Sequence, residues 1–183
     1  GGLALRQGGG LVLGLQTRVA AFNPASGRLE TLFQFADIDG AMRFNDGKAD
    51  ARGRFWIGNM KDPGLAPAGE EISDADKEGA GALWVLDADG SFQARESGFT
   101  TPNGFAWSLD DSLLYLADSH REAIYVHEYD LESVTIANRR LFASSRGEAG
   151  VPDGACLAPE GCHWITSHGG GCLARYQLDG VGV

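Results

Sequence analysis

Three short stretches of this sequence place an oxygen-bearing polar residue at the same point of one local pattern. They are "FNDGKADARGRFWIG" from Phe44, "TPNGFAWSLDDSLLYLAD" from Thr101 and "VPDGACLAPEGCHWIT" from Val151. In each, Asn or Asp directly precedes Gly, and an apolar run, a polar turn and a second apolar run follow. Amide and carboxylate oxygens are the ligands that hard divalent cations such as calcium and magnesium prefer. The pattern is therefore consistent with a cation site built from Asn45, which stands next to the Asp46-Gly47 pair, together with Asn103 and Asp153.

The same pairs can also be interpreted as turns. Gly accepts the positive φ that tight turns demand, and Asn and Asp tolerate it. One such pair alone would indicate only a turn. Three pairs at one equivalent position leave both interpretations open, so the elements that carry them have to be considered.

These elements form a weak internal repeat. The clearest predicted strands are "LVLGLQ" from Leu11, "FWIGNM" from Phe55, "LLYLAD" from Leu113 and "HWITSH" from His163, with starts 44, 58 and 50 residues apart. In each unit, this strand is preceded by another short run and a turn, and it is followed by a third strand. Three of the four units also show a fourth strand. Helical periodicity is nearly absent. Four short strands per unit at this spacing predict an all-β fold, the β-propeller, with about four blades in this chain.

In a propeller the first strand of every blade lines the central channel. The Asn-Gly and Asp-Gly pairs stand at the entry to these first strands. We therefore expect Asn45, Asn103 and Asp153 to meet at one mouth of the channel.

The four units do not make a complete ring. The first opens directly in its innermost strand, "GGLAL", and the last stops after "LDGVGV" without an outer strand. A ring closed from these ends would expose sheet edges. We expect residues 1–183 to form a single propeller segment that is incomplete at both ends.

Composition narrows the class of partner. Hydrophobic residues make up 43% and charged residues 22% of the chain, which is typical of a soluble globular protein. The formal net charge of −10 disfavours nucleic acid and anionic membranes, because both require a basic surface. No apolar run approaches the ~20 residues needed to cross a bilayer. No signal peptide is visible, although the chain starts with Gly1 rather than Met and a leader could precede it.

The cysteines favour a reducing compartment. Cys156, Cys162 and Cys172 are odd in number and form no CxxC motif, so we expect no disulfide framework and a cytoplasmic location. A zinc site would need histidines at regular spacing. We expect packed cysteines and surface histidines at His163 and His168 instead.

Two further motifs are weaker. The stretch "EEISDADKEG" from Glu70 mimics the opening of an EF-hand loop, but the glutamate expected at its twelfth position would fall on Val85. "HGGG" at His168 is similar to an esterase oxyanion motif, but no G-x-S-x-G nucleophile motif occurs. We expect a solvated loop and a glycine-rich turn at these places.

Taken together, the stretches resemble the SMP-30/gluconolactonase family. The resemblance is carried by "RFNDGKADARGRFWIGNM", "PNGFAWSLDDSLLYLADS" and "GVPDGACLAPEGCHWIT", with "SGRLETL", "GALWVLDADG" and "YDLESVTIANRRLF" in the expected order. It covers nearly the whole chain. It implies a six-bladed propeller with one divalent metal at the axial mouth, and enzymes that hydrolyse sugar lactones to aldonic acids.

The resemblance also implies roles for individual residues. Asn103 and Asp153 match metal ligands, Arg43 and Asn45 match substrate contacts, and Asp62 falls where the family often has an acidic substrate contact. Calcium is the expected metal, with zinc, magnesium, manganese and iron as alternatives. The family's first ligand is a glutamate in an early "EGP-W" motif that does not occur here, so two of three ligands are present.

The implied reaction is attack of water on the carbonyl of a small-molecule sugar lactone. A cation can polarise that carbonyl, and Asp153 can hold the cation or accept a proton from water. Arg43 can donate forked hydrogen bonds to substrate oxygens. Two alternatives remain: a noncatalytic propeller that acts as a calcium-binding regulator or protein-interaction platform, and a phosphotriesterase-like hydrolase.

Overall fold

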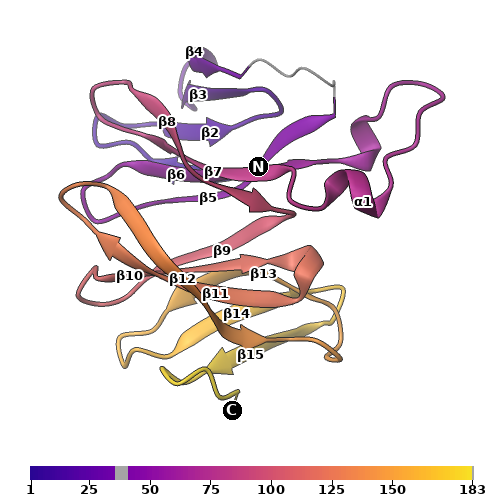
Figure 1. The fold of residues 1–183 in the computed structure, drawn as a ribbon. Helices are drawn as coiled ribbons and strands as arrows, with labels where there is room; N and C mark the ends of the chain where they lie inside the picture. Colours follow the sequence, from indigo (N-terminus) through magenta and orange to yellow (C-terminus); the bar gives the residue numbers. More distant parts are fainter. Residues whose placement is uncertain (36–40, 183) are drawn as a thin grey trace. The chain divides into compact units, whose positions relative to one another are not determined.

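A computed structural model of the protein describes residues 1–35 and 41–182. Almost all regular structure in this part of the chain is antiparallel sheet, arranged as four sheets of consecutive strands (Figure 1). The chain divides into two compact units, Gly1–Thr100 and Thr101–Val183, and each unit contains two of the sheets.

The first unit holds two four-stranded sheets. The first sheet has the order β1 (Leu3–Leu5), β2 (Leu11–Gly14), β3 (Arg18–Asn23) and β4 (Arg28–Gln34). The second has the order β5 (Met42–Ala49), β6 (Phe55–Lys61), β7 (Gly81–Leu86) and β8 (Phe92–Phe99). Strands β1 and β5, the first of each sheet, lie side by side.

The second unit holds a four-stranded and a three-stranded sheet. The former contains β9 (Pro102–Trp107), β10 (Leu113–Asp118), β11 (Ala123–Asp130) and β12 (Thr135–Ser144). The latter contains β13 (Val151–Leu157), β14 (His163–His168) and β15 (Cys172–Tyr176). Strand β13 lies beside β9, so the first strands are again neighbours.

This arrangement confirms the strands predicted from the repeat. The four clearest runs correspond to β2, β6, β10 and β14, and the fourth sheet lacks an outer strand among the described residues, as expected. Hairpin turns form where the sequence placed Gly. Gly27 and Gly90 adopt φ values of 69° and 84° in the turns before β4 and β8, a conformation that residues with a Cβ rarely adopt.

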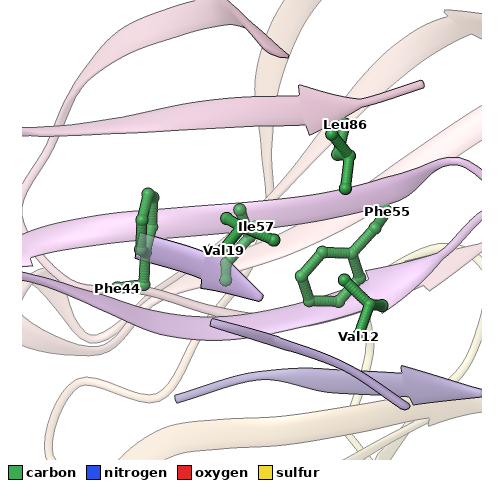
Figure 2. Close-up of a cluster of buried hydrophobic side chains, with 6 residues drawn as sticks. All are labelled: Val12, Val19, Phe44, Phe55, Ile57 and Leu86. Carbon is green, nitrogen blue, oxygen red and sulfur yellow. The ribbon is translucent and has the colours of Figure 1, made fainter. Parts of the chain in front are cut away.

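Apolar side chains between the two sheets of the first unit form its core. Figure 2 shows six of them: Val12, Val19, Phe44, Phe55, Ile57 and Leu86. They come from β2, β3, β5, β6 and β7, because alternate residues of a strand point to the same face. Burying one side chain of this size contributes about 1.5–3 kcal/mol, so this cluster fixes β5 against its neighbours.

The long connection from β6 to β7 carries the acidic stretch. It contains a short 3-10 helix, η1 (Pro63–Leu65), and one helical turn, α1 (Asp74–Lys77). Asp76 forms a capping box with Ser73. The Asp76 carboxylate accepts hydrogen bonds from the Ser73 amide and hydroxyl, and the Asp76 amide donates to the Ser73 hydroxyl oxygen. The resemblance to an EF-hand opening thus reflects a helix cap.

The expected distribution of cysteines and histidines is wrong in part. Cys156 and Cys172 are exposed rather than packed. His163 is fully buried, with its ring centroid 5.3 Å from that of Tyr115. It shares a face of β14 with buried Ile165, and the two-residue period of the strand therefore turns it inward. The cysteines form no disulfide in the described residues, as expected.

No helix in the described residues is long and apolar enough to cross a membrane.

Candidate metal and substrate site

The three inner strands that carry the predicted site residues share a local irregularity. In β5, β9 and β13, the pairing with the following strand slips by one residue. The two residues that face a single partner are Asn45 and Asp46 in β5, Gly104 and Phe105 in β9, and Asp153 and Gly154 in β13. Bulges bend a strand and redirect its side chains, and they are common beside active sites. The Asn-Gly and Asp-Gly pairs therefore mark bulges within strands rather than ordinary turns.

In the second unit, a buried hydroxyl connects the two inner strands. The Asn103 Nδ2 atom of β9 donates to Ser119 Oγ at 2.8 Å, and that hydroxyl donates to the Pro152 carbonyl of β13 at 2.6 Å. Asn103 and Ser119 are only 7% and 6% exposed. The residue next to Asp153 is thus tied to Asn103 through one side chain.

Gly104 makes the close approach of these strands possible. A Cβ atom at this position would lie 2.6 Å from the carbonyl oxygen of Asp153, and φ is 61°. Both facts exclude an ordinary side chain. Gly154 is different, because its nearest neighbour would be Thr166 Oγ1 at 3.8 Å. The two Gly residues of the matching motifs therefore have different physical roles.

Asp153 is half-buried in the bulge of β13. Within the described residues, its carboxylate has no hydrogen bond or ion pair to another side chain. The Asn103 amide, by contrast, uses its nitrogen on Ser119, which leaves Oδ1 as its acceptor. One neutral and one anionic oxygen donor therefore stand on neighbouring strands, a donor set that suits a hard cation.

In the first unit, the predicted substrate contacts bind one another. Arg43 Nε forms an ion pair and hydrogen bond with Asp62, and Arg43 Nη1 donates to Asn45 Oδ1 at 2.6 Å and to the Phe44 carbonyl at 3.2 Å. The side chains of Arg43 and Asp62 are 29% and 25% exposed. Arg43 thus links a residue of the β5 bulge to the loop that follows β6.

Backbone contacts hold Asp62 in this place. Its amide donates to the Ala41 carbonyl at 2.8 Å, and its carboxylate caps η1 by accepting from the Gly64 amide at 2.9 Å. The Arg43 hydrogen bond, helped by that of Gly64, lowers the pKa of Asp62 below its usual value, against the opposing effect of desolvation. Asp62 is therefore an anion at neutral pH.

The structure brings together Arg43, Asn45 and Asp62 in one unit, and it places Asn103 and Asp153 on the neighbouring strands β9 and β13 of the other. Within residues 1–35 and 41–182, no group of three or more His, Cys, Asp or Glu side chains could hold a metal. Sequence reasoning missed Ser119. Ser119 could have been found from its position directly after the "LLYLAD" strand, because the last residue of that strand pairs with Pro102 of the "PNG" motif.

Sheets of consecutive antiparallel strands, with a bulge at or directly beside the predicted polar residue of β5, β9 and β13, define a β-propeller protein with a polar site. The whole chain, residues 1–183, matches the model of one family, described as the SMP-30/Gluconolactonase/LRE-like region. The chain belongs to this family.

Curated relatives agree with the assignment. The chain is 36% identical over 152 residues to an uncharacterized protein of Sulfolobus acidocaldarius, which covers 83% of the chain and 51% of that protein. It is 34% identical over 175 residues to regucalcin of Xenopus laevis, and this match covers 96% of the chain and 56% of that protein. The chain therefore spans about half the length of the curated relatives that it matches.

Solved structures share the fold. A calcium-binding protein, regucalcin, from Agrobacterium tumefaciens has a TM-score of 0.83 and 23% identity, over 99% of this chain and 57% of that one. A gluconolactonase from Xanthomonas campestris has a TM-score of 0.77 and 22% identity, over 100% of this chain and 60% of that one. The predicted fold class, a β-propeller with about four blades in this chain, is confirmed.

Proposed function

We propose that the protein carrying this sequence is a divalent-metal-dependent hydrolase that converts a sugar lactone to its aldonic acid. The observation that carries the proposal is the placement of Asn103 and Asp153 on the adjacent strands β9 and β13, with the nitrogen of the Asn103 amide already bound. The family assignment and the gluconolactonase name of one solved structure support the same reaction class.

In this proposal, Asn103 Oδ1 and the Asp153 carboxylate hold the cation, and a further oxygen ligand comes from outside residues 1–183. The residues present fit a hard cation, because the Asp153 carboxylate is uncommitted among the described residues and the Asn103 oxygen is left as an acceptor. Calcium is the preferred ion, given the calcium-binding name of one structural neighbour. When bound, the ion would supply Lewis-acid polarisation of the lactone carbonyl.

The side chains of the first unit would bind and orient the sugar. Arg43 uses Nε and Nη1 in its contacts with Asp62, Asn45 and Phe44, and Nη2, which has no hydrogen bond to any described residue, would donate to substrate oxygens. Asp62 would accept from a sugar hydroxyl with Oδ1, which accepts from the Gly64 amide and can accept a second hydrogen bond. This role requires Asp62 to be ionised, which its lowered pKa ensures.

Asp153 would also act on the proton of the attacking water. A carboxylate within hydrogen-bond reach of water can accept its proton as the bond to the carbonyl carbon forms. Breaking of the ring C–O bond would then pass that proton from Asp153 to the leaving ring oxygen, so the product is a carboxylic acid, which ionises in solution, and a hydroxyl.

One observation favours a second candidate function. The Agrobacterium neighbour is a calcium-binding protein. A cation held by Asn103 and Asp153 could serve in a calcium-binding regulator or a protein-interaction platform, and lactone turnover would then be absent. The two candidates differ in activity rather than in metal binding.

The test measures acid release in the full-length protein by pH-stat titration on a panel of aldonolactones and one phosphotriester, with and without chelator. Spontaneous ring opening is subtracted. We expect a chelator-sensitive rate on at least one lactone, loss of that rate in Asp153→Ala, and an unchanged rate in Asp179→Ala. Asp179 is a matched control, because it caps a hairpin turn by accepting from the Val181 amide.

Each other outcome identifies a different function. Chelator-sensitive turnover of only the phosphotriester would favour the phosphotriesterase-like alternative. Cation binding that Asp153→Ala abolishes, without turnover of any ester, would support the regulator. A full lactonase rate in Asp153→Ala would contradict the mechanism.

A further inference from the structure

The hydroxyl of Ser119 donates its hydrogen in only one of its two hydrogen bonds. A serine hydroxyl carries a single hydrogen atom. Ser119 Oγ lies 2.6 Å from the Pro152 carbonyl oxygen, which can only accept, so the hydrogen is committed to that bond. Towards any other neighbour, the hydroxyl oxygen is an acceptor.

This commitment determines the orientation of the Asn103 side chain. The Asn103 amide lies 2.8 Å from Ser119 Oγ and has both a donating and an accepting end. Because the Ser119 hydroxyl already donates its hydrogen to Pro152, only the NH₂ end of the amide can form a hydrogen bond with it. The amide oxygen of Asn103 is therefore held on the side away from Ser119.

The surroundings make the arrangement rigid. Ser119 and Asn103 are buried, so water does not compete for these bonds. The Ser119 amide donates to the Thr101 carbonyl at 3.0 Å, and the Thr101 amide donates to Asp118 Oδ1 at 2.9 Å. Backbone and side-chain bonds thus anchor Ser119 to the start of β9 from two sides.

We propose that Ser119 is a positioning residue for the cation site: its hydroxyl fixes the Asn103 amide so that Oδ1 is the atom presented to the cation, and it holds β13 at the distance that places Asp153 beside it. The proposal rests on the proposed function, in which Asn103 and Asp153 hold a divalent cation. It also explains why position 103 carries an amide and not a second carboxylate. A carboxylate would have no hydrogen to offer the Ser119 oxygen.

The first experiment measures calcium affinity of the full-length protein by isothermal titration calorimetry. Removal of a residue that orients a metal ligand typically reduces affinity about 10- to 100-fold, and we expect a loss of this size in Ser119→Ala. Ser119→Thr keeps the hydroxyl and should stay within a few-fold of the parent. The control is Ser145→Ala, which removes a buried hydroxyl of the same unit that has no hydrogen-bond partner among the described residues.

A second variant tests the committed hydrogen and leaves Ser119 in place. Added ligand charge normally tightens calcium binding, so Asn103→Asp should gain affinity if charge alone matters. We expect it to lose affinity, because the new carboxylate would face a hydroxyl oxygen without a hydrogen to donate. Tighter binding by Asn103→Asp would overturn the proposal.

A third measurement needs no metal. In the ¹⁵N spectrum of the metal-free protein, the Asn103 side-chain NH₂ should exchange slowly with solvent in the parent and at least tenfold faster in Ser119→Ala. If the parent binds no divalent cation, both the proposed function and the cation role of Ser119 fail. If the parent binds calcium and Ser119→Ala binds within twofold of it, or its NH₂ exchange is unchanged, only the role of Ser119 fails.

Discussion

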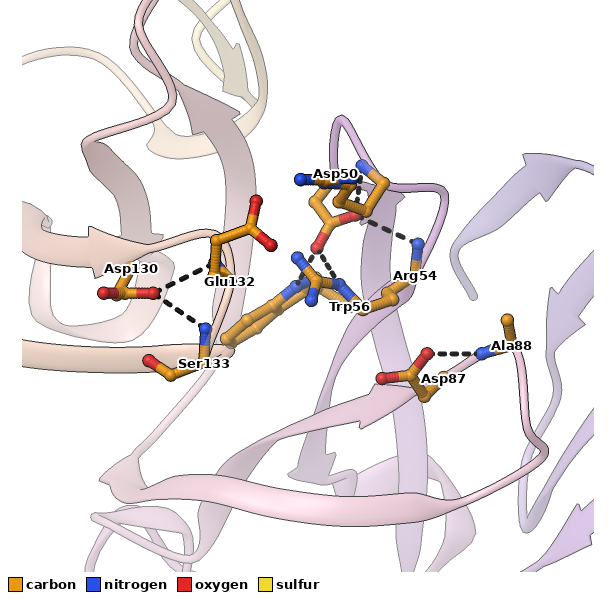
Figure 3. A network of polar contacts seen from close by, with 9 residues as sticks. Asp50, Arg54, Trp56, Asp87, Ala88, Asp130, Glu132 and Ser133 are labelled. Atoms are coloured by element: carbon orange, nitrogen blue, oxygen red, sulfur yellow. Dashed lines mark hydrogen bonds and ion pairs between the residues drawn. The ribbon is translucent and has the colours of Figure 1, made fainter.

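A buried ion pair in the turn between β5 and β6 allows a quantitative test of what holds the second sheet together. Asp50 accepts hydrogen bonds from the Arg52 and Arg54 amides at 2.9 and 3.0 Å, from Arg54 Nε at 2.7 Å and from Trp56 Nε1 at 3.2 Å (Figure 3). The side chains of Asp50 and Arg54 are 0% and 7% exposed. One carboxylate therefore satisfies four donors, and three of them belong to buried residues.

Replacement of Asp50 by Ala removes the carboxylate that pairs with the buried Arg54 side chain. Breaking a buried pair by removing one partner costs about 3–5 kcal/mol of the free energy of unfolding, and we expect a loss in this range. For a unit of about 100 residues, this corresponds to a lowering of the melting temperature by about 12 °C or more. Asp50→Asn keeps an acceptor but loses the charge, so it should cost less, about 1.5–3 kcal/mol.

The assay is urea unfolding followed by tryptophan fluorescence, which Trp56 reports directly, together with circular dichroism. The matched control is Glu30→Ala, which breaks the Arg28–Glu30 pair, whose side chains are 74% and 58% exposed. An exposed pair contributes at most about 1 kcal/mol. If Asp50→Ala lowers stability no more than Glu30→Ala does, the turn does not depend on this carboxylate and the reasoning is refuted.

Two other predictions concern the site strands. Gly104→Ala should lower the free energy of unfolding by about 2–5 kcal/mol, because it combines an unfavourable positive φ with a close contact to the Asp153 carbonyl. Gly154→Ala should change it by less than about 0.5 kcal/mol. Equal effects of the two substitutions in urea unfolding would contradict this. Arg43→Ala should raise the pKa of Asp62 in a carboxyl NMR titration. The folded-state pKa of Asp62 is depressed, so its contribution to stability is present above the unfolded value of about 3.9 and is lost as pH falls through the folded value; an unchanged pKa in the variant would contradict the ion pair.

The strands were predictable because their signals are local. Short β-branched and aromatic runs between Gly and Asp-Gly turns specify hairpins without reference to the rest of the chain. The repeat then specified which hairpins form one sheet, and the runs from Leu11, Phe55, Leu113 and His163 all became second strands. The buried position of His163 was missed, since its type suggests the surface while the alternation of β14 decides its side.

The site was predictable only in its polar motifs. Asn103 and Asp153 could be found by their equivalent places, but their link through Ser119 depends on the approach of two backbones about 50 residues apart in sequence. The Arg43–Asp62 pair was also not foreseen, although both residues were chosen as substrate contacts. No local pattern reports that two candidate residues will bind each other.

The two ends of the site-bearing sheets are stabilised in different ways. At one end, the turn from the first strand to the second is held by hydrogen bonds within the same sheet. Asp50 accepts them after β5, and Ser108 and Asp110 form them after β9. At the opposite end, Asn45 in the bulge of β5 and Asn103 beside the bulge of β9 make side-chain hydrogen bonds with Arg43 and Ser119. Because the turns stabilise the sheets without the bulged end, that end can hold polar groups whose geometry suits a ligand. Substitutions in the turns should therefore change the free energy of unfolding more than the affinity for cation, and substitutions at the bulges should show the reverse balance, except where Gly104 permits two backbones to meet.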